Sequence, residues 1–352
     1  MRMSHPIGHL APPQRQAQLA DTAGELHVFE GLPLAAVSIS EGMLVVPTVD
    51  GGESRARAGD GAAIAMWASA GSDEVQWTRF RDDPLHTESP LTVDQTNESV
   101  ILDERAILKW QLFATESVAA TKEQLLHAAN FENTPGLWGH LWWGSEKLIA
   151  SVVEYVPDTQ DGWTWAADAL GRGEFEWASV VGEITAHMHA ALARGGHGVY
   201  DDTSAPARDL VGARTQLIHG DFHVGQVLRR EDQFFVIDFD GDPLKSASEN
   251  FELQSPLLDV VSMSCSIIHA GMVAIKRGAE QAAVYETITR ARSAFLSAYQ
   301  ANASHANFSS ETFSTLVDRV EQREIAYAEQ YLPRWLYAPR GAVEYLRTVD
   351  GR

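Results

Sequence analysis

The sequence predicts an α+β fold in which strands occupy the first half of the chain and helices the second half. Up to Val156, short apolar runs separated by turn residues dominate, as in an antiparallel sheet. Beyond Val156, apolar residues recur at helical spacing over four long segments. A chain of 352 residues also exceeds the size at which one hydrophobic core stops growing, about 250–300 residues. We therefore expect two or three domains.

The composition indicates a globular protein whose partners are small molecules. Hydrophobic residues make up 45% of the chain, and 10 residues are tryptophan, which is enough to bury a large core. Asp and Glu number 48 against 27 Lys and Arg, a net charge of −21, which disfavours binding to nucleic acid or to an anionic membrane. The single cysteine, Cys265, excludes an intrachain disulfide and a cysteine-rich zinc site.

We expect no export signal and no membrane-spanning segment. The first residues, up to Ala20, are polar and contain several prolines, unlike a secretory signal. The longest apolar stretch, near Ile267–Ile275, is interrupted by His269. These features predict a cytoplasmic protein, and we expect it to be a monomer.

Residues 1–89 are expected to form an N-terminal cap subdomain made of short strands. Three apolar runs alternate with glycine-rich turns, which predicts a small antiparallel unit. The runs are Leu34–Ile39, Met43–Val46 and Ala62–Trp67. The polar stretch Arg79–Pro90, which contains Pro84, marks the expected boundary.

Residues 90–157 are expected to form a small lobe. Val100–Leu102 and Ala106–Leu108 flank three charged residues and predict a β-hairpin. A helix is expected over Ser117–Ala129 and a further strand region over Leu148–Val156.

Residues 158–352 are expected to form a mainly helical lobe. The segments with helical periodicity are Phe175–Ala193, Leu257–Ile275, Ala279–Ala301 and Glu311–Leu332. Short strands are expected at Leu217–Ile218, Val227–Leu228 and Phe234–Ile237.

The densest cluster of polar side chains lies in two turns of this helical lobe. Asp221 follows an apolar strand residue pair, and a carboxylate held in such a turn can take the proton of a substrate hydroxyl. Gln226 and Asp238 offer oxygen atoms, the ligands that Mg²⁺ prefers. The pattern predicts phosphoryl transfer, with Asp221 as the catalytic residue.

Three stretches resemble the aminoglycoside phosphotransferase-like kinases and, among them, the maltokinase-like sugar kinases. His219–Gln226 and Ile237–Pro243 are similar to the catalytic and metal-binding loops of that group, and Ser255–Val260 extends the similarity into the next helix. The resemblance implies a protein-kinase-like bilobal fold, with a strand-rich small lobe and a helical large lobe, that uses ATP and Mg²⁺.

The resemblance also implies roles for individual residues. Asp221 would orient or deprotonate the acceptor hydroxyl, while Gln226 and Asp238 would hold Mg²⁺, with Asp240 assisting a second ion. The residues expected at the nucleotide are Lys109, Glu123, Thr96, Asn97, Ser99, Glu154 and Val156.

Each of these nucleotide residues corresponds to a part of the kinase fold. Lys109 occupies the position of the strand lysine that meets the phosphates, and Glu123 that of its helix partner, with Glu116 as an alternative. The polar loop 95–99 contains no glycine, unlike the phosphate-covering loop of protein kinases. The strand end at 154–156 resembles the hinge that receives adenine.

The acceptor is expected to be an amino sugar. The chain is shorter than maltokinases, and its stretch 321–337 resembles bacterial glucosamine kinases of the same group, which implies transfer to the 6-hydroxyl of glucosamine. Carboxylates would bind the sugar ammonium by charge-assisted hydrogen bonds. The expected sugar-binding residues are Asp221, His223, Asp259, Gln322, Glu324, Tyr331 and Trp335.

Several alternatives stay open from the sequence. The acceptor could be maltose or an aminoglycoside, and the glycine-free loop would also suit a nucleotide-binding pseudokinase that acts as a scaffold. His219 and His223 have the i, i+4 spacing of a zinc pair, but only a helix would bring them together, and Gly220 argues against one. Lys109 could be an ordinary surface lysine, and the C-terminal aromatics could belong to the core.

Overall fold

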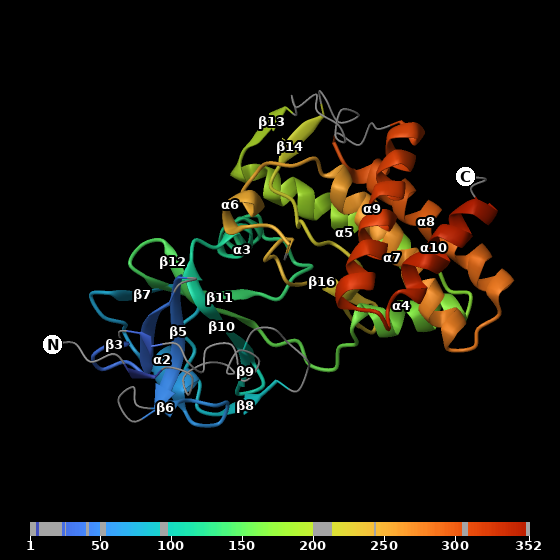
Figure 1. Ribbon diagram of the computed structural model, residues 1–352. Coiled ribbons are helices and arrows are strands. Elements are labelled where there is room, and N and C mark those ends of the chain that lie inside the picture. Colours follow the sequence, from blue (N-terminus) through green and yellow to red (C-terminus); the bar gives the residue numbers. More distant parts are fainter. Residues whose placement is uncertain are drawn as a thin grey trace. The chain divides into compact units, whose positions relative to one another are not determined.

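The protein is described here from a computed structural model covering residues 5–6, 23–24, 26–39, 42–49, 54–91, 98–199, 213–242, 244–304 and 309–349. Tertiary contacts divide the chain into two compact units (Figure 1). The strand-rich unit comprises residues 1–120 and 135–157, and the helical unit comprises residues 121–134 and 158–352. The α+β class, with strands early and helices late, is therefore confirmed.

The strand-rich unit is built on one antiparallel sheet that has 10 strands within the described residues. Its main path runs β3-β4-β5-β10-β12-β11-β7, while β6 pairs with β5 and β8 pairs with β9, which pairs with β10. The strands are β3 (Leu26–Val28), β4 (Leu34–Ile39), β5 (Gly42–Val49), β6 (Ser54–Arg55), β7 (Val75–Arg79), β8 (Glu88–Pro90), β9 (Glu98–Leu102), β10 (Ala106–Thr115), β11 (Leu137–Trp143) and β12 (Lys147–Glu154). A separate pair, β1 (His5–Pro6) and β2 (Ala23–Gly24), precedes them.

The expected hairpin near residue 100 is confirmed. Strands β9 and β10 pair with Leu102 opposite Ala106. The turn residues Asp103 and Glu104 have φ values of 49° and 53°, the left-handed conformation that matches the twist of two paired strands.

The expected strand at Ala62–Trp67 is wrong, because these residues form helix α2 (Ala62–Ala68). The segment is rich in alanine, the best helix former. Its buried residues Ala62, Ala63, Met66 and Trp67 recur at the spacing of one helical face rather than of a strand.

Strands from both sides of the expected boundary at residues 89 and 90 belong to the same sheet. Strand β5, from the first segment, pairs with β10 through Leu44 and Phe113, and β7 pairs with β11. The division into a cap of 1–89 and a small lobe of 90–157 stays a prediction, whereas the boundary after Pro157 coincides with the end of the strand-rich unit.

The helical unit contains α4 (Gly162–Gly171), α5 (Trp177–Leu192), α6 (Ala247–Asn250), α7 (Leu257–Lys276), α8 (Gln281–Asn302), α9 (Ser310–Tyr331), α10 (Tyr337–Val349) and most of α3 (Val118–Ala128). Two short hairpins lie among the helices. They are formed by β13 (His197–Val199) with β14 (Arg214–Gln216) and by β15 (Val227–Arg230) with β16 (Gln233–Val236). Short 3₁₀ turns occur at Ala193–Gly195 and Val224–Gln226.

Helix α7 is the core element of this unit and packs against α4, α8, α9 and α10. Among the described residues it is the one helix long and apolar enough to span a membrane. Most of its side chains are buried between the neighbouring helices, as expected for the core helix of a globular protein.

The sequence analysis missed α4, α10 and β11, and it placed one strand too late. The expected strand Leu217–Ile218 is not paired, since β14 ends at Gln216. Gln216 itself bridges to Gln254, and the chain then leaves the hairpin. Leu217 and Ile218 instead become buried as they lead into the predicted catalytic loop.

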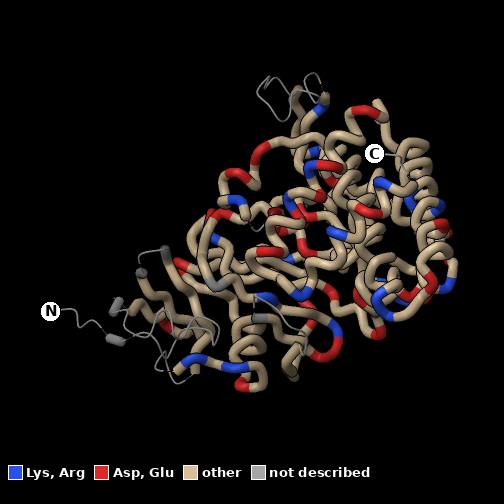
Figure 2. The backbone as a smooth tube through the Cα atoms, turned by 45° about the vertical axis from the view of Figure 1, so that its right-hand side comes forward, with Lys and Arg blue, Asp and Glu red and all other residues tan. Residues whose placement is uncertain are grey.

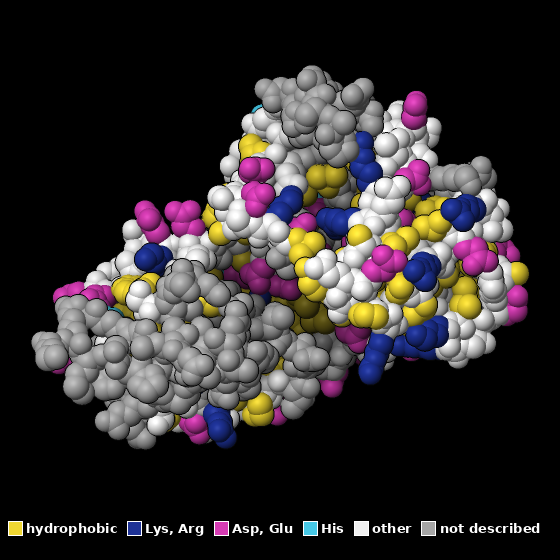
Figure 3. Space-filling view, viewed as in Figure 1, with side chains coloured by type: hydrophobic (Ala, Val, Ile, Leu, Met, Phe, Trp, Pro, Cys, Tyr) yellow, Lys and Arg dark blue, Asp and Glu magenta, His cyan; other side chains and the backbone are white. Residues whose placement is uncertain are grey.

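Asp and Glu residues occur along the backbone of both units (Figure 2). On the visible face of the helical unit, Lys and Arg side chains lie among Asp, Glu and hydrophobic side chains (Figure 3). The charge of −21 is thus spread over the molecule, which favours solubility.

Replacing Gly162 by alanine is expected to destabilise the helical unit. A Cβ at Gly162 would overlap the carbonyl oxygen of Val224, so α4 would have to move away from the turn Val224–Gln226. Overpacking of this kind typically lowers the free energy of unfolding by about 1–3 kcal/mol, measurable by urea denaturation.

The matched control is Gly171→Ala in the same helix. Its Cβ would meet only the Cβ atoms of Ala274 and Ala279, each at 3.7 Å, which is ordinary van der Waals contact. Gly171→Ala should leave the urea midpoint unchanged or raise it. Equal destabilisation by the two variants would contradict this account.

Candidate active site

The predicted catalytic loop, residues 217–226, is fixed by a carboxylate beneath it. Asp259, in the first turn of α7, accepts hydrogen bonds from the backbone N–H of His219 at 2.7 Å and of Gly220 at 2.9 Å. A third bond comes from Nε2 of His189 at 3.0 Å. These bonds tie the loop to the core helix of the unit.

Asp259 is therefore placed beneath the loop, not at a cavity wall as expected for a sugar ligand. Its side chain is buried, with 1% of the residue exposed. Burial alone raises the pKa of a carboxyl group, but the hydrogen bond and charge of His189, with the other donors, lower the pKa of Asp259 overall. It is a charged anchor whose oxygens are engaged inside the protein.

His219 packs under the loop and does not form a zinc pair with His223. It is fully buried, and its Nε2 donates to the carbonyl oxygen of Ile237 at 3.0 Å. Its ring lies between those of Phe222 and Phe239, with centroid distances of 5.2 and 5.0 Å. Burial lowers the pKa of His219, so the ring is neutral.

Gln226 and Asp238, the two predicted metal ligands, lie side by side. Backbone N–H of Ile237 donates to the carbonyl oxygen of Gln226 at 3.0 Å, and Nε2 of Gln226 donates to Oδ2 of Asp238 at 3.3 Å. Asp238 has a φ of 65°, an uncommon left-handed conformation for a residue with a side chain.

This pair of side chains fits Mg²⁺ better than a soft metal. Mg²⁺ takes few protein ligands and completes its shell with water and phosphate oxygens. In the described part of the chain, no group of three or more His, Cys, Asp and Glu side chains is arranged to hold a metal ion. One carboxylate and one amide, with Asp240 on the same loop, suit a metal that arrives with a nucleotide.

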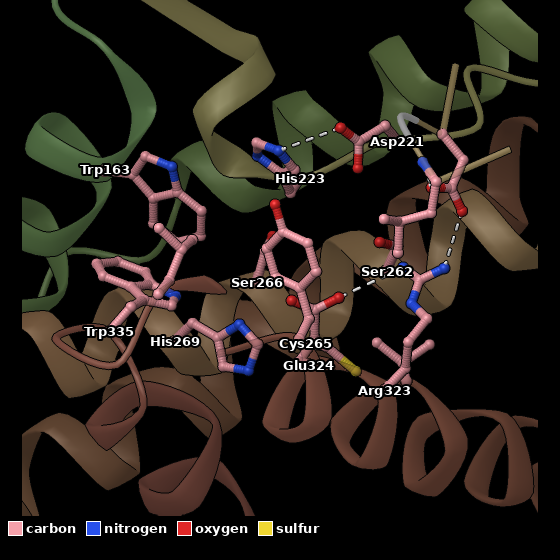
Figure 4. Close-up of a pocket in the computed structure, with 15 residues that line it drawn as sticks. Trp163, Asp221, His223, Ser262, Cys265, Ser266, His269, Arg323, Glu324 and Trp335 are labelled. Carbon is pink, nitrogen blue, oxygen red and sulfur yellow. Dashed lines mark hydrogen bonds and ion pairs between the residues drawn. The ribbon is translucent and has the colours of Figure 1, made fainter. Parts of the chain in front are cut away.

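Asp221 opens onto a cavity of about 520 Å³ in the helical unit (Figure 4). The wall is formed by the catalytic loop, the start of α4, one face of α7, one face of α9 and the turn before α10. Four residues expected at the substrate line it: Asp221, His223, Glu324 and Trp335.

The two titratable groups of the loop that line the cavity, Asp221 and His223, have opposite pKa shifts with one main cause. Burial raises the pKa of Asp221 to about 6 and lowers the pKa of His223 to about 4, because burial disfavours the charged form of each group. At pH 7 Asp221 is an unusually basic carboxylate and His223 is neutral. Their closest atoms, Oδ2 and Nε2, are 3.8 Å apart, too far for a hydrogen bond.

Another part of the cavity wall combines aromatic rings with charges. Trp163 stacks on His223 at 5.4 Å between ring centroids and meets Trp335 edge to face at 4.9 Å. Arg323 bonds Asp242 at 3.2 Å and Glu324 at 3.4 Å. Flat rings beside carboxylates form a surface that can receive a sugar ring and a positive charge together.

His269 lies in this wall and pairs with a buried carboxylate. Its Nε2 donates to Oε2 of Glu321 at 2.9 Å, and both side chains are almost fully buried. Burial alone would lower the pKa of His269, but Glu321 raises it above its usual value. The pair therefore favours the protonated form of a histidine at the cavity wall.

Comparisons with known proteins show which family the chain belongs to. No family model matches the chain. The chain is 33% identical over 357 residues to a glucosamine kinase from Streptacidiphilus jiangxiensis, a match that covers 82% of each chain. The chain belongs to the glucosamine kinase family.

Two further relatives carry the same family name. A glucosamine kinase from Mycolicibacterium smegmatis is 31% identical over 385 residues, covering 88% of this chain and 94% of the relative. A solved structure of a glucosamine kinase in complex with glucosamine, ADP and inorganic phosphate matches with a TM-score of 0.78 and 29% identity, covering 99% of this chain and 100% of that one. The match confirms the recognised kinase group and its fold.

Not every residue expected at the substrate of this glucosamine kinase family member reaches the cavity. Gln322 is exposed, and Tyr331, the last residue of α9, is 55% exposed and lies outside the cavity lining. Trp335 does line the cavity, but from a turn rather than a helix, because α9 ends before Pro333. A residue that precedes proline is disfavoured in a helix.

Among the lining residues that the sequence analysis did not predict are Trp163, His269 and Arg323. Trp163 lies at the start of α4, a helix that was not predicted. His269 was noted only as an interruption of an apolar run, and Arg323 only as a neighbour of Glu324. A histidine within the apolar helix α7 was the available signal, because a buried histidine needs a polar partner such as Glu321.

Residues expected at the nucleotide lie mostly in the strand-rich unit, and their roles stay predictions. Lys109 is half-buried on β10, with Ser99 of β9 and Ser151 of β12 as its strand neighbours. Glu154 ends β12 and exchanges hydrogen bonds with Gly136, and Val156 is buried. Glu123 lies on α3. Thr96 and Asn97 lie outside the described residues.

The rate of phosphorylation should depend on pH through Asp221. A base must be ionised to take a proton, and burial raises the pKa of Asp221 to about 6. We therefore expect kcat/KM for the sugar to be constant above pH 7 and to fall up to tenfold per pH unit below about 6. Steady-state assays from pH 5 to 8 measure this.

The control for this pH profile is the affinity for ADP, followed over the same range by calorimetry. It should change much less, since Asp221 is assigned to the acceptor hydroxyl. A value of kcat/KM that stays constant down to pH 5 would rule out Asp221 as a base with this pKa.

Proposed function

We propose that this chain transfers the γ-phosphoryl group of Mg²⁺-ATP to the 6-hydroxyl of glucosamine. The observation that carries the proposal is a single cavity lined by a basic carboxylate, Asp221, by a second carboxylate, Glu324, and by two tryptophans, Trp163 and Trp335. Membership of the glucosamine kinase family supports the same acceptor, as does a relative whose structure holds glucosamine, ADP and inorganic phosphate.

Each side chain of the site has a different role in the proposed reaction. Asp221 accepts the proton of the sugar hydroxyl while the hydroxyl oxygen forms a bond to the γ-phosphorus of ATP. The bond between the γ-phosphorus and the β,γ-bridging oxygen breaks, and ADP is released. His223, neutral at pH 7 because burial lowers its pKa to about 4, can hydrogen-bond to the sugar without repelling an ammonium group. Trp163 and Trp335 exclude water from one side of the sugar.

Gln226 and Asp238 would hold the metal, with Asp240 close by on the same loop. When bound, Mg²⁺ neutralises phosphate charge that develops during transfer. The side-chain contact between Gln226 and Asp238 supports this assignment, because two oxygen-bearing groups are already side by side.

Glu324 is proposed to bind the ammonium of the amino sugar. Its side chain is 31% exposed and lines the cavity, so it can bind a ligand without moving from the wall. A charge-assisted hydrogen bond to this group favours glucosamine over glucose and maltose, which carry no positive charge.

A cytoplasmic, monomeric enzyme suits the single cysteine and the acidic composition.

Replacement of Asp221 by asparagine is expected to reduce turnover strongly. Asparagine keeps the shape but cannot accept the proton, and removal of a general base typically costs a factor of about 10²–10⁴ in rate. The measurement is kcat by coupled assay of ADP release, together with the affinity for ADP, which should change little.

Asp232→Asn is the control for this variant. Asp232 is fully exposed in the turn between β15 and β16, and its replacement should leave kcat unaltered. Turnover of Asp221→Asn at the level of the wild type would remove the catalytic role from this residue.

Replacement of Glu324 by glutamine is expected to weaken discrimination for the amino sugar. Loss of a charged hydrogen bond of about 1.5–3 kcal/mol should raise KM for glucosamine at least about tenfold and leave KM for glucose nearly constant. Kinetics with glucosamine, glucose, maltose and an aminoglycoside measure the change and also separate the alternative acceptors.

Glu329→Gln is the matched control, since Glu329 lies on the same helix and pairs with Arg340 on the surface. Its substrate preference should equal that of the wild type. If the wild-type enzyme prefers maltose or an aminoglycoside, that compound replaces glucosamine as the proposed acceptor. If none of the four compounds is phosphorylated, the pseudokinase alternative is favoured.

A further inference from the structure

A buried lysine connects the two loops that carry the reaction. Lys122, on α3, has 1% of its surface exposed. Its Nζ donates to the carbonyl oxygen of His219 at 2.8 Å and to that of Phe239 at 3.2 Å. His219 lies two residues before Asp221, and Phe239 lies between Asp238 and Asp240. One ammonium group therefore touches both the catalytic loop and the metal-binding loop.

Lys122 is still mainly charged at pH 7 although burial lowers its pKa. Burial lowers the pKa of Lys122 to about 8, while the carboxylates of Asp259, Asp240 and Asp238 oppose this shift. An ammonium group removed from water destabilises the fold unless it gains partners. A methionine would fill the same space without that cost, so the charge and its hydrogen bonds call for a specific explanation.

The two loops approach each other closely at one glycine of each loop, Gly220 and Gly241. A Cβ on Gly220 would lie 3.3 Å from Cα of Gly241, and both glycines have positive φ values, 91° and 87°. Their backbones are thus in direct contact. The position of one loop relative to the other depends on groups that reach across this contact, and Lys122 and His219 do so by hydrogen bonds to carbonyl oxygens.

We propose that Lys122 is a positioning residue that fixes the catalytic loop and the metal-binding loop relative to each other before the nucleotide binds. The inference rests on the proposed function only in that these loops carry phosphoryl transfer. Lys122 itself does not line the sugar cavity. Its effect on the reaction is indirect, through the distance and angle between Asp221 and the pair Gln226 and Asp238.

The proposal predicts a joint loosening of the two loops when Lys122 is replaced. Lys122→Met keeps the length of the stem and removes the donors, so the carbonyl groups of His219 and Phe239 lose a shared partner. Hydrogen exchange of the full chain, measured by mass spectrometry without nucleotide or metal, should show exchange about tenfold faster or more in both 217–224 and 237–242. The remaining helices should keep their protection.

A second buried cation of the same unit provides the control. Arg292, on α8, is 8% exposed and donates to Oγ of Ser264 at 3.0 Å, away from both loops in the chain. Arg292→Met also removes a buried positive charge, so it measures the effect of a general loss of stability on exchange. It should not speed exchange in the two loops more than in the helices around them.

Kinetics provide an independent measurement. In Lys122→Met, kcat should fall at least about tenfold and the affinity for Mg²⁺-ADP should fall. KM for glucosamine should stay within about threefold, because Glu324, Trp163 and Trp335 line the cavity from outside the two loops. A variant that is merely less stable would show normal kcat and KM at a temperature where it is folded.

Wild-type exchange of both loops in folded Lys122→Met, or faster exchange spread evenly over the unit, would overturn the proposal. If Lys122→Met does not fold, the same exchange measurement is made on Lys122→Gln, whose shorter side chain keeps a hydrogen-bond donor but carries no charge. Faster exchange in both loops of Lys122→Gln would support the positioning role, and unaltered exchange would reject it. Exchange needs no substrate. If Lys122→Met loosens both loops but the wild-type chain does not phosphorylate glucosamine, the proposed function is contradicted. The positioning role of Lys122 would still stand.

Discussion

The buried carboxylate of Asp259 is the constraint on which the geometry of the site depends. It holds the backbone N–H groups of His219 and Gly220 at the end of the core helix α7, so the loop that carries Asp221 is attached to the most buried element of the unit. A carboxylate can be ionised at such a position only when hydrogen bonds replace water. Loss of Asp259 would leave both amides without a partner and free the loop.

Two carboxylates of this site show how the same burial produces different chemistry. Asp259 receives several donors, and they lower its pKa. Asp221, two residues further along the loop from His219, has burial as the main influence, and its pKa is raised to about 6. The first remains an ionised anchor over a wide pH range, while the second is basic enough to exchange a proton near neutral pH. The hydrogen-bond donors around each carboxylate therefore decide the direction of its pKa shift.

The acceptor side combines groups from helices that are distant in sequence. Helix α7 contributes His269, helix α9 contributes Glu324, and Trp163 and Trp335 come from the ends of neighbouring elements. Membership of the glucosamine kinase family agrees with a wall of this kind, where a carboxylate and flat rings can meet an amino sugar. Selectivity by charge needs no deep pocket, because glucose and maltose lack the ammonium group that Glu324 would bind.

Sequence reasoning alone identified Asp221, Gln226 and Asp238, and the structure brings Gln226 and Asp238 into contact. These residues lie within short loops and one hairpin, where local spacing determines which side chains meet. The anchoring by Asp259, the bridge from Lys122 and the place of Trp335 needed the tertiary structure. Lys122 and Phe239 are 117 positions apart, and Trp335 reaches the cavity only because the chain turns at Pro333. Periodicity describes neighbours along one element, whereas contacts between elements depend on how their apolar faces pack.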